Sequence, residues 1–137
     1  MYKLLAKEEY DVTRHVTLRN LKTGTEDYCF DCSDMVDLKY NVRDFWFMEV
    51  GKKYDCKIEL FGDITPSDVG EKALCLVVRD DILVGNRRRV EVKVDEDIYY
   101  VPRKEVEGFL KEGEFYYYYT RKDLIQVDNV IHGDYLH

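Results

Sequence analysis

Cysteine and histidine are the residues of this sequence best suited to hold a metal ion or to act in covalent catalysis. Cys29 and Cys32 form a C-x-x-C pair, a spacing at which two thiolates can bind zinc. The residues around the pair have the pattern of a β-strand, in which residues three positions apart point to opposite faces. Cys56 and Cys75 are isolated in the sequence. We therefore expect four reduced thiols, no metal site and no cofactor.

The histidines and carboxylates do not form a recognisable catalytic set. His15 opens a predicted strand, where a solvated histidine is expected, and His132 and His137 lie in a tail that we expect to fray. The sequence has no G-x-S-x-G motif, no H-E-x-x-H motif and no glycine-rich loop for phosphate. The acidic clusters at 80–81 and 95–97 fall at predicted turns, where aspartate is favoured for local hydrogen bonds. The sequence thus names no catalytic residue and points away from an enzyme. An enzyme whose site is assembled from distant segments stays open as an alternative.

Three consecutive arginines could bind an anionic partner. Arg87, Arg88 and Arg89 follow a predicted turn, and with Lys72 and Lys93 they could form a local positive patch. Single-stranded nucleic acid is bound by such a patch when aromatic rings nearby stack on the bases. The net charge of −7 disfavours this partner, since affinity for phosphate rests on lysine and arginine. Nucleic-acid binding through an OB-like face is therefore the alternative hypothesis.

Tyrosine is the other residue in excess, with twelve copies. A run of five aromatic residues near the end of the sequence predicts a strand, which would place either Tyr117 and Tyr119 or Tyr116 and Tyr118 on the outer face. We select Tyr99, Tyr117 and Tyr119 as candidate binding residues, because an exposed tyrosine offers a large rigid contact with a polar tip. The opposite interpretation is that a helix or the other half of the chain covers these rings.

Composition indicates one globular domain. A chain of 137 residues fits a single domain, and 45% hydrophobic with 36% charged residues is typical of a folded protein. No apolar run is long enough to span a bilayer, and the N-terminal residues are too charged for a signal peptide. We therefore expect an acidic cytoplasmic protein that does not contact membranes.

The residues from 45 to 63 give the clearest structural signal. Tyr54, Cys56, Ile58 and Leu60 alternate with charged residues, which predicts a strand with one buried and one solvated face. The Phe-Trp-Phe-Met sequence that opens this stretch is too apolar to be exposed, and we expect it to lie across the core as a plug.

Turn residues and apolar periodicity predict further elements along the chain. The expected elements are a hairpin of 14–21 with 27–32, a strand 73–78 whose continuous apolar run predicts burial on both faces, an interruption at 79–81, a resumed strand 82–84 joined by the Gly85-Asn86 turn to a strand 89–94, a returning strand 98–101, a helix 102–112, and a last strand 124–131. Residues 120–123 are expected to form a turn or a capping box. Residues 33–44 are expected to connect two strands across the mouth or edge of a barrel.

Many short strands at this spacing predict a mainly β fold with one or two short helices. The natural architecture is a small antiparallel barrel or sandwich, OB-like or SH3-like by size. The single domain 1–137 could consist of two hairpin-plus-strand halves, 1–63 and 72–131. Our leading hypothesis for function is a non-enzymatic binding module for another, unidentified protein, such as an inhibitor or immunity-type adaptor, engaged through a sheet face or edge.

Overall fold

The structure is a computed structural model that describes residues 1–10, 13–32 and 45–136. Most of these residues lie in strands of one hydrogen-bonded sheet, so the predicted mainly β fold with short helices is confirmed. The strands are β1 (Tyr2–Glu9), β2 (Arg14–Asn20), β3 (Glu26–Asp31), β4 (Lys53–Tyr54), β5 (Cys56–Asp63), β6 (Glu71–Val84), β7 (Arg87–Val94), β8 (Asp97–Pro102), β9 (Glu114–Val127) and β10 (Val130–Ile131). The helical segments are α1 (Arg103–Val106) and two 3₁₀ helices, η1 (Glu107–Glu112) and η2 (Gly133–Tyr135). The expected connection at 33–44 lies outside the described residues.

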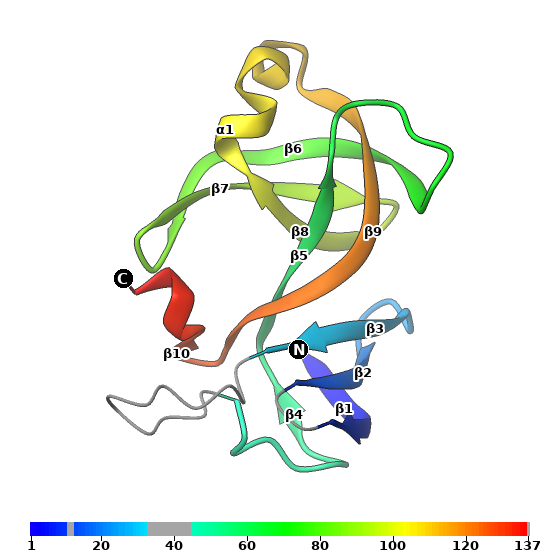
Figure 1. Cartoon of the computed structure of the whole chain (residues 1–137), viewed down its shortest axis with the longest axis vertical. Coiled ribbons are helices and arrows are strands. Elements are labelled where there is room, and N and C mark those ends of the chain that lie inside the picture. The colour runs from blue at the N-terminus through cyan, green and yellow to red at the C-terminus, as the bar shows by residue number, and fades with distance from the viewer. Residues whose placement is uncertain (11–12, 33–44, 137) are drawn as a thin grey trace.

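Five strands close into a small barrel. Strand β9 pairs with β5 on one edge and with β6 on the other, and β6, β7 and β8 follow as an antiparallel meander. The barrel closes where β8 meets β5 in parallel, at the pair Glu59 and Tyr100. The α1 segment lies at one end of the molecule, as Figure 1 shows. Its Val106 is fully buried in the core.

The N-terminal strands extend this barrel at its other end (Figure 1). They are ordered β4, β1, β2, β3, and all their pairings with one another are antiparallel. Strand β3 joins the barrel through two parallel pairs with β9, at Cys29 with Lys122 and at Phe30 with Asp123. The interpretation as halves 1–63 and 72–131 stays a prediction, and β5 lies within the barrel between β9 and β8.

The buried face that alternation predicted for residues 53–60 is confirmed, although the stretch is divided into β4 and β5 and the expected solvated position of Glu59 is buried. Tyr54, Ile58 and Leu60 are buried in the main core, and Cys56 packs against it. The expected hairpins of β2 with β3, β6 with β7, and β7 with β8 are also present. The prediction that the 73–78 run is buried on both faces and interrupted at 79–81 is wrong, because β6 runs unbroken from Glu71 to Val84 and exposes Leu74, Leu76 and Val78 on one face. Burial of the inward face of each strand stabilises these elements by roughly 25 cal/mol per Å² of apolar area.

The apolar plug is present only in part. Phe45 and Met48 are fully buried in the main core, whereas Phe47 is exposed and its ring packs edge-on against Tyr54. The segment forms a turn, with the amide of Met48 donating to the carbonyl of Phe45. A turn directs its side chains to several sides, so the whole segment cannot face the core.

Two predicted elements differ in form. The helix expected at 102–112 is α-helical only to Val106 and continues as a 3₁₀ helix, with Gly113 ending it in the left-handed conformation at φ 75°. The turn or capping box expected at 120–123 is wrong, because β9 runs unbroken through these residues. The polar side chains of these residues are typical of a turn, but the backbone of residues 121–123 pairs with β3 and β5. The extended structure expected at 124–131 is present, but not as one last strand: residues 124–127 end β9, and β10 turns back at Asp128, φ 50°, to pair with β9 antiparallel.

None of the helices among the described residues is long and apolar enough to cross a membrane.

Gly62 sits where β5 and β9 approach closely beside a register shift. A Cβ at this position would lie 1.9 Å from the carbonyl oxygen of Tyr118, so the backbone would have to move. We expect Gly62→Ala to lower the free energy of unfolding by about 1–3 kcal/mol, measured by urea denaturation. Gly108→Ala is the control, since a Cβ there meets nothing within 4 Å and its stability should be unchanged or slightly higher. Equal stability of the two variants would contradict the close approach of β5 and β9 at Gly62.

Candidate functional site

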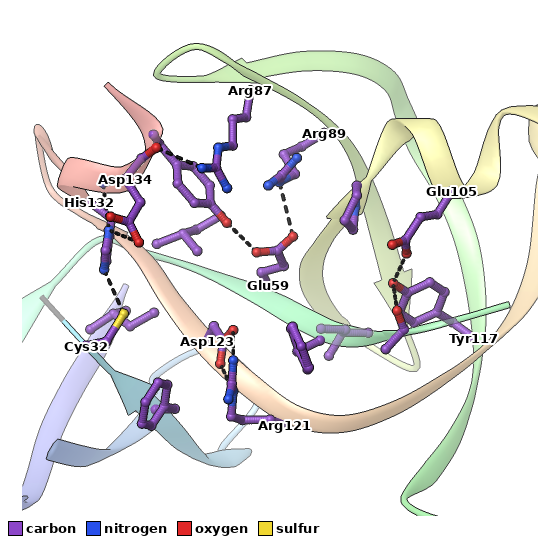
Figure 2. Close-up of a pocket in the computed structure, with 18 residues that line it drawn as sticks. Cys32, Glu59, Arg87, Arg89, Glu105, Tyr117, Arg121, Asp123, His132 and Asp134 are labelled. Atoms are coloured by element: carbon purple, nitrogen blue, oxygen red, sulfur yellow. Dashed lines mark hydrogen bonds and ion pairs between the residues drawn. The ribbon is translucent and has the colours of Figure 1, made fainter. Parts of the chain in front are cut away.

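The candidate site is a groove of about 340 Å³ that reaches from exposed residues such as Phe61 to core residues such as Leu60 and Tyr117. Strands β5, β7 and β9 and the C-terminal η2 turn supply its walls, as Figure 2 shows. Charged side chains from segments far apart in sequence point into it, with Arg87 and Arg89 on one side and Arg121 on the other.

The centre of the groove is a buried cluster of Glu59, Arg89 and Tyr135. The Tyr135 hydroxyl donates a short hydrogen bond to the Glu59 carboxylate, and Arg89 Nε lies 3.2 Å from Glu59 Oε1. The guanidinium groups of Arg87 and Arg89 lie 4.6 and 4.8 Å from the Tyr135 ring centre. Burial raises the pKa of Glu59 even though Arg89 opposes the shift, and burial together with Glu59 raises the pKa of Tyr135.

Arg121 forms the opposite wall. Its guanidinium makes two hydrogen bonds to Asp123, of 2.6 and 3.0 Å. Phe30 and Phe61 place their ring centres 4.4 and 4.2 Å from the same guanidinium, which is cation–π geometry. Hydrogen bonding to Asp123 is the main cause that raises the pKa of Arg121, so this cation is held in one orientation.

Beside α1 the groove ends at the hydroxyl of Tyr117. This hydroxyl lies 2.8 Å from a Glu105 carboxylate oxygen and 2.9 Å from the carbonyl oxygen of Gly62. Burial, followed by the hydrogen bond to Glu105, raises the pKa of Tyr117. The ring therefore links α1 to β5 from inside the barrel.

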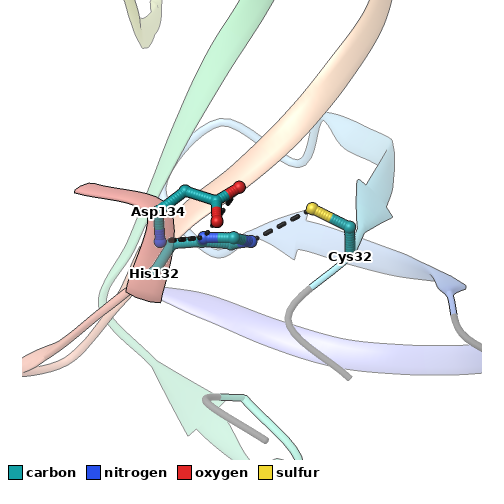
Figure 3. Close-up of side chains that lie close together, drawn as sticks. All are labelled: Cys32, His132 and Asp134. Atoms are coloured by element: carbon teal, nitrogen blue, oxygen red, sulfur yellow. Dashed lines mark hydrogen bonds and ion pairs between the residues drawn. The ribbon is translucent and has the colours of Figure 1, made fainter. Parts of the chain in front are cut away.

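The other end holds Cys32, His132 and Asp134 (Figure 3). Cys32 Sγ lies 3.1 Å from His132 Nε2, and the Asp134 amide donates to His132 Nδ1 at 3.1 Å. His132 is buried, so the expectation that this part of the tail frays is wrong. Burial, and then the charges of Asp134, Asp31 and Asp123, raise the pKa of Cys32 to about 11. A catalytic cysteine needs an electropositive setting, so this thiol is not an activated nucleophile at neutral pH.

A second surface of interest is an apolar sheet face, which we call the β6–β9 face. It consists of Leu74, Leu76, Val78, Tyr116 and Tyr118. Four of these residues are 41–51% exposed, and Tyr118 is half-buried. Leu74 pairs directly with Tyr116 across the two strands, and Leu76 and Tyr118 each lie two residues along from this pair on the same face.

Charged residues border this face. Lys72 places its ammonium 4.3 Å from the Tyr116 ring centre, and Leu76 lies between Glu114 on β9 and Lys93 on β7 in the strand register. An apolar centre with a polar rim is the usual anatomy of a protein interface.

The tyrosines selected from sequence are not on the surface that was expected of them. Tyr99 and Tyr117 are buried, so neither can offer its ring to a partner, and Tyr119 is half-buried against the main core. The alternative set weighed from the sequence, Tyr116 and Tyr118, faces outward instead. Packing sets this choice, because the Tyr117 hydroxyl contacts Glu105 on α1 and Gly62 on β5 and its side chain belongs to the main core.

The three arginines are also separated. Arg88 is exposed and pairs with Asp81 at 3.1 Å, whereas Arg87 and Arg89 turn toward Tyr135 in the groove. They do not form the single positive patch that their sequence suggested. Lys72 and Lys93, expected to join that patch, border the β6–β9 face instead.

Sequence reasoning did not find Glu59, Arg121 or Tyr135 as site residues. The alternating pattern predicted that Glu59 is solvated, and the polar residues around Arg121 predicted a turn. The run of aromatic residues correctly predicted strand β9, but it did not predict which face of that strand is exposed.

Comparison of the chain with protein families, with curated proteins and with solved structures finds no match.

The raised pKa of Glu59 predicts a particular pH dependence of stability. The folded protein holds this proton more tightly than the unfolded chain does. The resulting stabilisation is therefore complete below the ordinary glutamate pKa of 4.5 and is lost as the pH rises through the folded-state value. We expect the difference in free energy of unfolding between wild type and Glu59→Gln to fall across that window, measured by denaturation at a series of pH values.

Glu96→Gln is the matched control, because Glu96 is exposed in the turn between β7 and β8. The free energy of unfolding of Glu96→Gln should change with pH as that of the wild type does. A difference for Glu59→Gln that stays flat or grows with pH would show that burial does not govern this carboxyl group.

Proposed function

We propose that the protein is a non-enzymatic binding module that docks another protein on the β6–β9 face. The observation that carries this proposal is the run of apolar side chains on the outer side of two paired strands. Monomeric soluble proteins rarely expose a continuous apolar patch without a use for it. Leu74, Leu76 and Tyr116 supply the centre of the patch.

The proposed affinity comes from burying apolar side chains against a rigid surface. The face is part of a closed barrel, so a partner would not have to order it on binding, which limits the entropic cost of association. Tyr116 offers a large ring whose hydroxyl can still reach a polar group of the partner. Removing these side chains from water would supply the affinity, at roughly 25 cal/mol per Å² before the costs of association.

The charge of the protein constrains the partner. The net charge of −7 favours a partner with basic residues around an apolar centre, because opposite charges speed encounter and orient docking. An inhibitor or immunity-type adaptor would work in this way. We place it in the cytoplasm, where all four cysteines, free of disulfides in the structure, would stay reduced.

A second candidate function rests on the order of strand pairing. An OB-fold is a five-stranded Greek-key barrel that binds oligonucleotides on the face of its second and third strands. In this protein β6, β7 and β8 form the meander, α1 follows β8, β9 returns to β6, and β5 lies between β9 and β8. We interpret this as OB-like pairing in which the last barrel strand has been placed first in the chain.

The corresponding ligand face, on β7 and β8, is covered by the chain's own C-terminal turn. Tyr100 on this face packs with Ile125 and Tyr135 in a second apolar cluster. Arg89 is paired with Glu59 and therefore has less charge to offer a phosphate. An oligonucleotide would have to displace η2 against an overall negative charge. Protein binding is therefore our first choice.

The leading proposal can be tested by site-specific photo-crosslinking. A benzophenone amino acid would replace Leu76 or Tyr116, and irradiation in native lysate would be followed by mass spectrometry. We expect both positions to capture the same protein. Tyr10, also strongly exposed but on the distant β1 end, is the control position and should not capture it. Identical adducts at all three positions, or none on the face, would contradict the proposal.

Once captured, the partner allows affinity to be measured. We expect Leu76→Glu to weaken binding about tenfold or more, because docking would then bury an unpaired carboxylate in the apolar centre of the interface. Tyr10→Glu should bind like wild type.

The nucleic-acid candidate is tested by fluorescence anisotropy with a labelled oligothymidylate. That candidate predicts binding at low salt that weakens steeply as salt rises. It also predicts tighter binding by Tyr135→Ala, in which the covering ring is removed. Failure of both proteins to bind at low salt would exclude it.

A further inference from the structure

We infer that Cys32, His132 and Asp134 form a binding site for a divalent transition metal, with zinc as the best chemical match. This inference does not rest on the proposed function, because the three residues lie at the end of the groove and not on the β6–β9 face.

The geometry is close to that of a metal site. The thiol, imidazole and carboxylate ligand atoms all lie within 4.8 Å of one another, with 3.1 Å between Sγ and Nε2 and 3.8 Å between Nδ1 and an Asp134 oxygen. Around tetrahedral zinc, with bonds of about 2.0–2.3 Å, ligand atoms lie roughly 3.3–3.8 Å apart. Small side-chain rotations would therefore bring the three groups around one ion.

The backbone holds His132 in position. The amide of His132 donates to the carbonyl of Ile125 at 3.0 Å, and the amide of Tyr135 donates to the carbonyl of His132 at 2.9 Å. The imidazole also packs against the rings of Phe45 and Tyr135. Cys32 directly follows strand β3, so the two halves of the site are brought together from segments 100 residues apart.

The local charge favours a cation. Asp134, Asp31 and Asp123 all act on the sulfur of Cys32, which makes the surroundings of this thiol negative. A negative setting disfavours a bare thiolate but favours a thiolate that is shared with a dication. The same setting argues against the competing interpretation of a nucleophilic cysteine–histidine pair.

Binding of the metal exchanges protons in a defined way. The Cys32 thiol loses its proton to solvent and binds as a thiolate. If the metal takes Nε2 of His132, the ring proton moves to Nδ1, which then gives up the hydrogen bond it accepts from the Asp134 amide. Thiolate, imidazole and carboxylate together are a ligand set that suits zinc, and three protein ligands leave a fourth position for water or another ligand.

The test uses the purified chain of 137 residues and Co²⁺ as a spectroscopic probe. We expect titration with CoCl₂ to produce a near-ultraviolet sulfur-to-cobalt charge-transfer band and intensified visible bands of four-coordinate cobalt. These bands should saturate at one ion per chain, and ZnCl₂ should abolish them by competition.

Three variants assign the ligands. Cys32→Ser should remove the charge-transfer band, and His132→Gln and Asp134→Asn should each weaken binding by tenfold or more. Asp134 is exposed, so its replacement keeps the test valid if the buried histidine variant fails to fold. Cys56→Ser is the matched control, because Cys56 is also half-buried, and it should keep the wild-type spectrum. Absence of the charge-transfer band in the wild type, or its survival in Cys32→Ser, would overturn the inference.

Discussion

The whole structure depends on the hydrogen-bond ladders of strand β9. This one strand pairs with β5 and β6 to close the barrel and with β3 to attach the N-terminal sheet. A buried polar contact strengthens the second junction, because Lys122 on β9 lies 2.5 Å from the Asp27 carboxylate and the Tyr99 hydroxyl donates to the same group at 2.8 Å. The buried charge of Asp27 is thereby paired and hydrogen-bonded, without which its burial would be strongly unfavourable.

The fold class could be predicted from sequence because most strands bury one face and leave the other in water. Val16 and Leu18 on β2 show this pattern, because both are fully buried, whereas Thr17 is half-buried and Arg19 is exposed. The reasoning failed at β9, where Arg121 and Lys122 read as a turn. Lys122 is paired with Asp27, which stands 95 residues earlier in the chain. Arg121 makes its hydrogen bonds to Asp123 on β9 itself, but its guanidinium packs on the rings of Phe30 and Phe61 from other strands. Local polarity cannot reveal such long-range contacts. For the same reason the sequence could not predict the strand order or the parallel pairing of β5 with β8 that closes the barrel.

The candidate sites were harder to predict, because each depends on which face of a strand the rest of the chain covers. The tyrosine run identified β9, yet only the packing of α1 and β5 decides that Tyr117 is buried and Tyr116 is exposed. No local sequence pattern indicates that Cys32 and His132 lie close together. Their meeting follows from the path of β9 and β10, which returns the C-terminal turn to the end of β3.

The position of β5 at the start of the barrel has a consequence for biosynthesis. A ribosome releases this strand well before its neighbours β8 and β9 exist, because those neighbours are encoded downstream of it. The nascent chain therefore carries an unpaired strand with apolar residues until the codons for β9 have been translated. Closure of the barrel therefore has to wait for β9, and until then the apolar face of β5 lacks the strands that cover it in the folded protein.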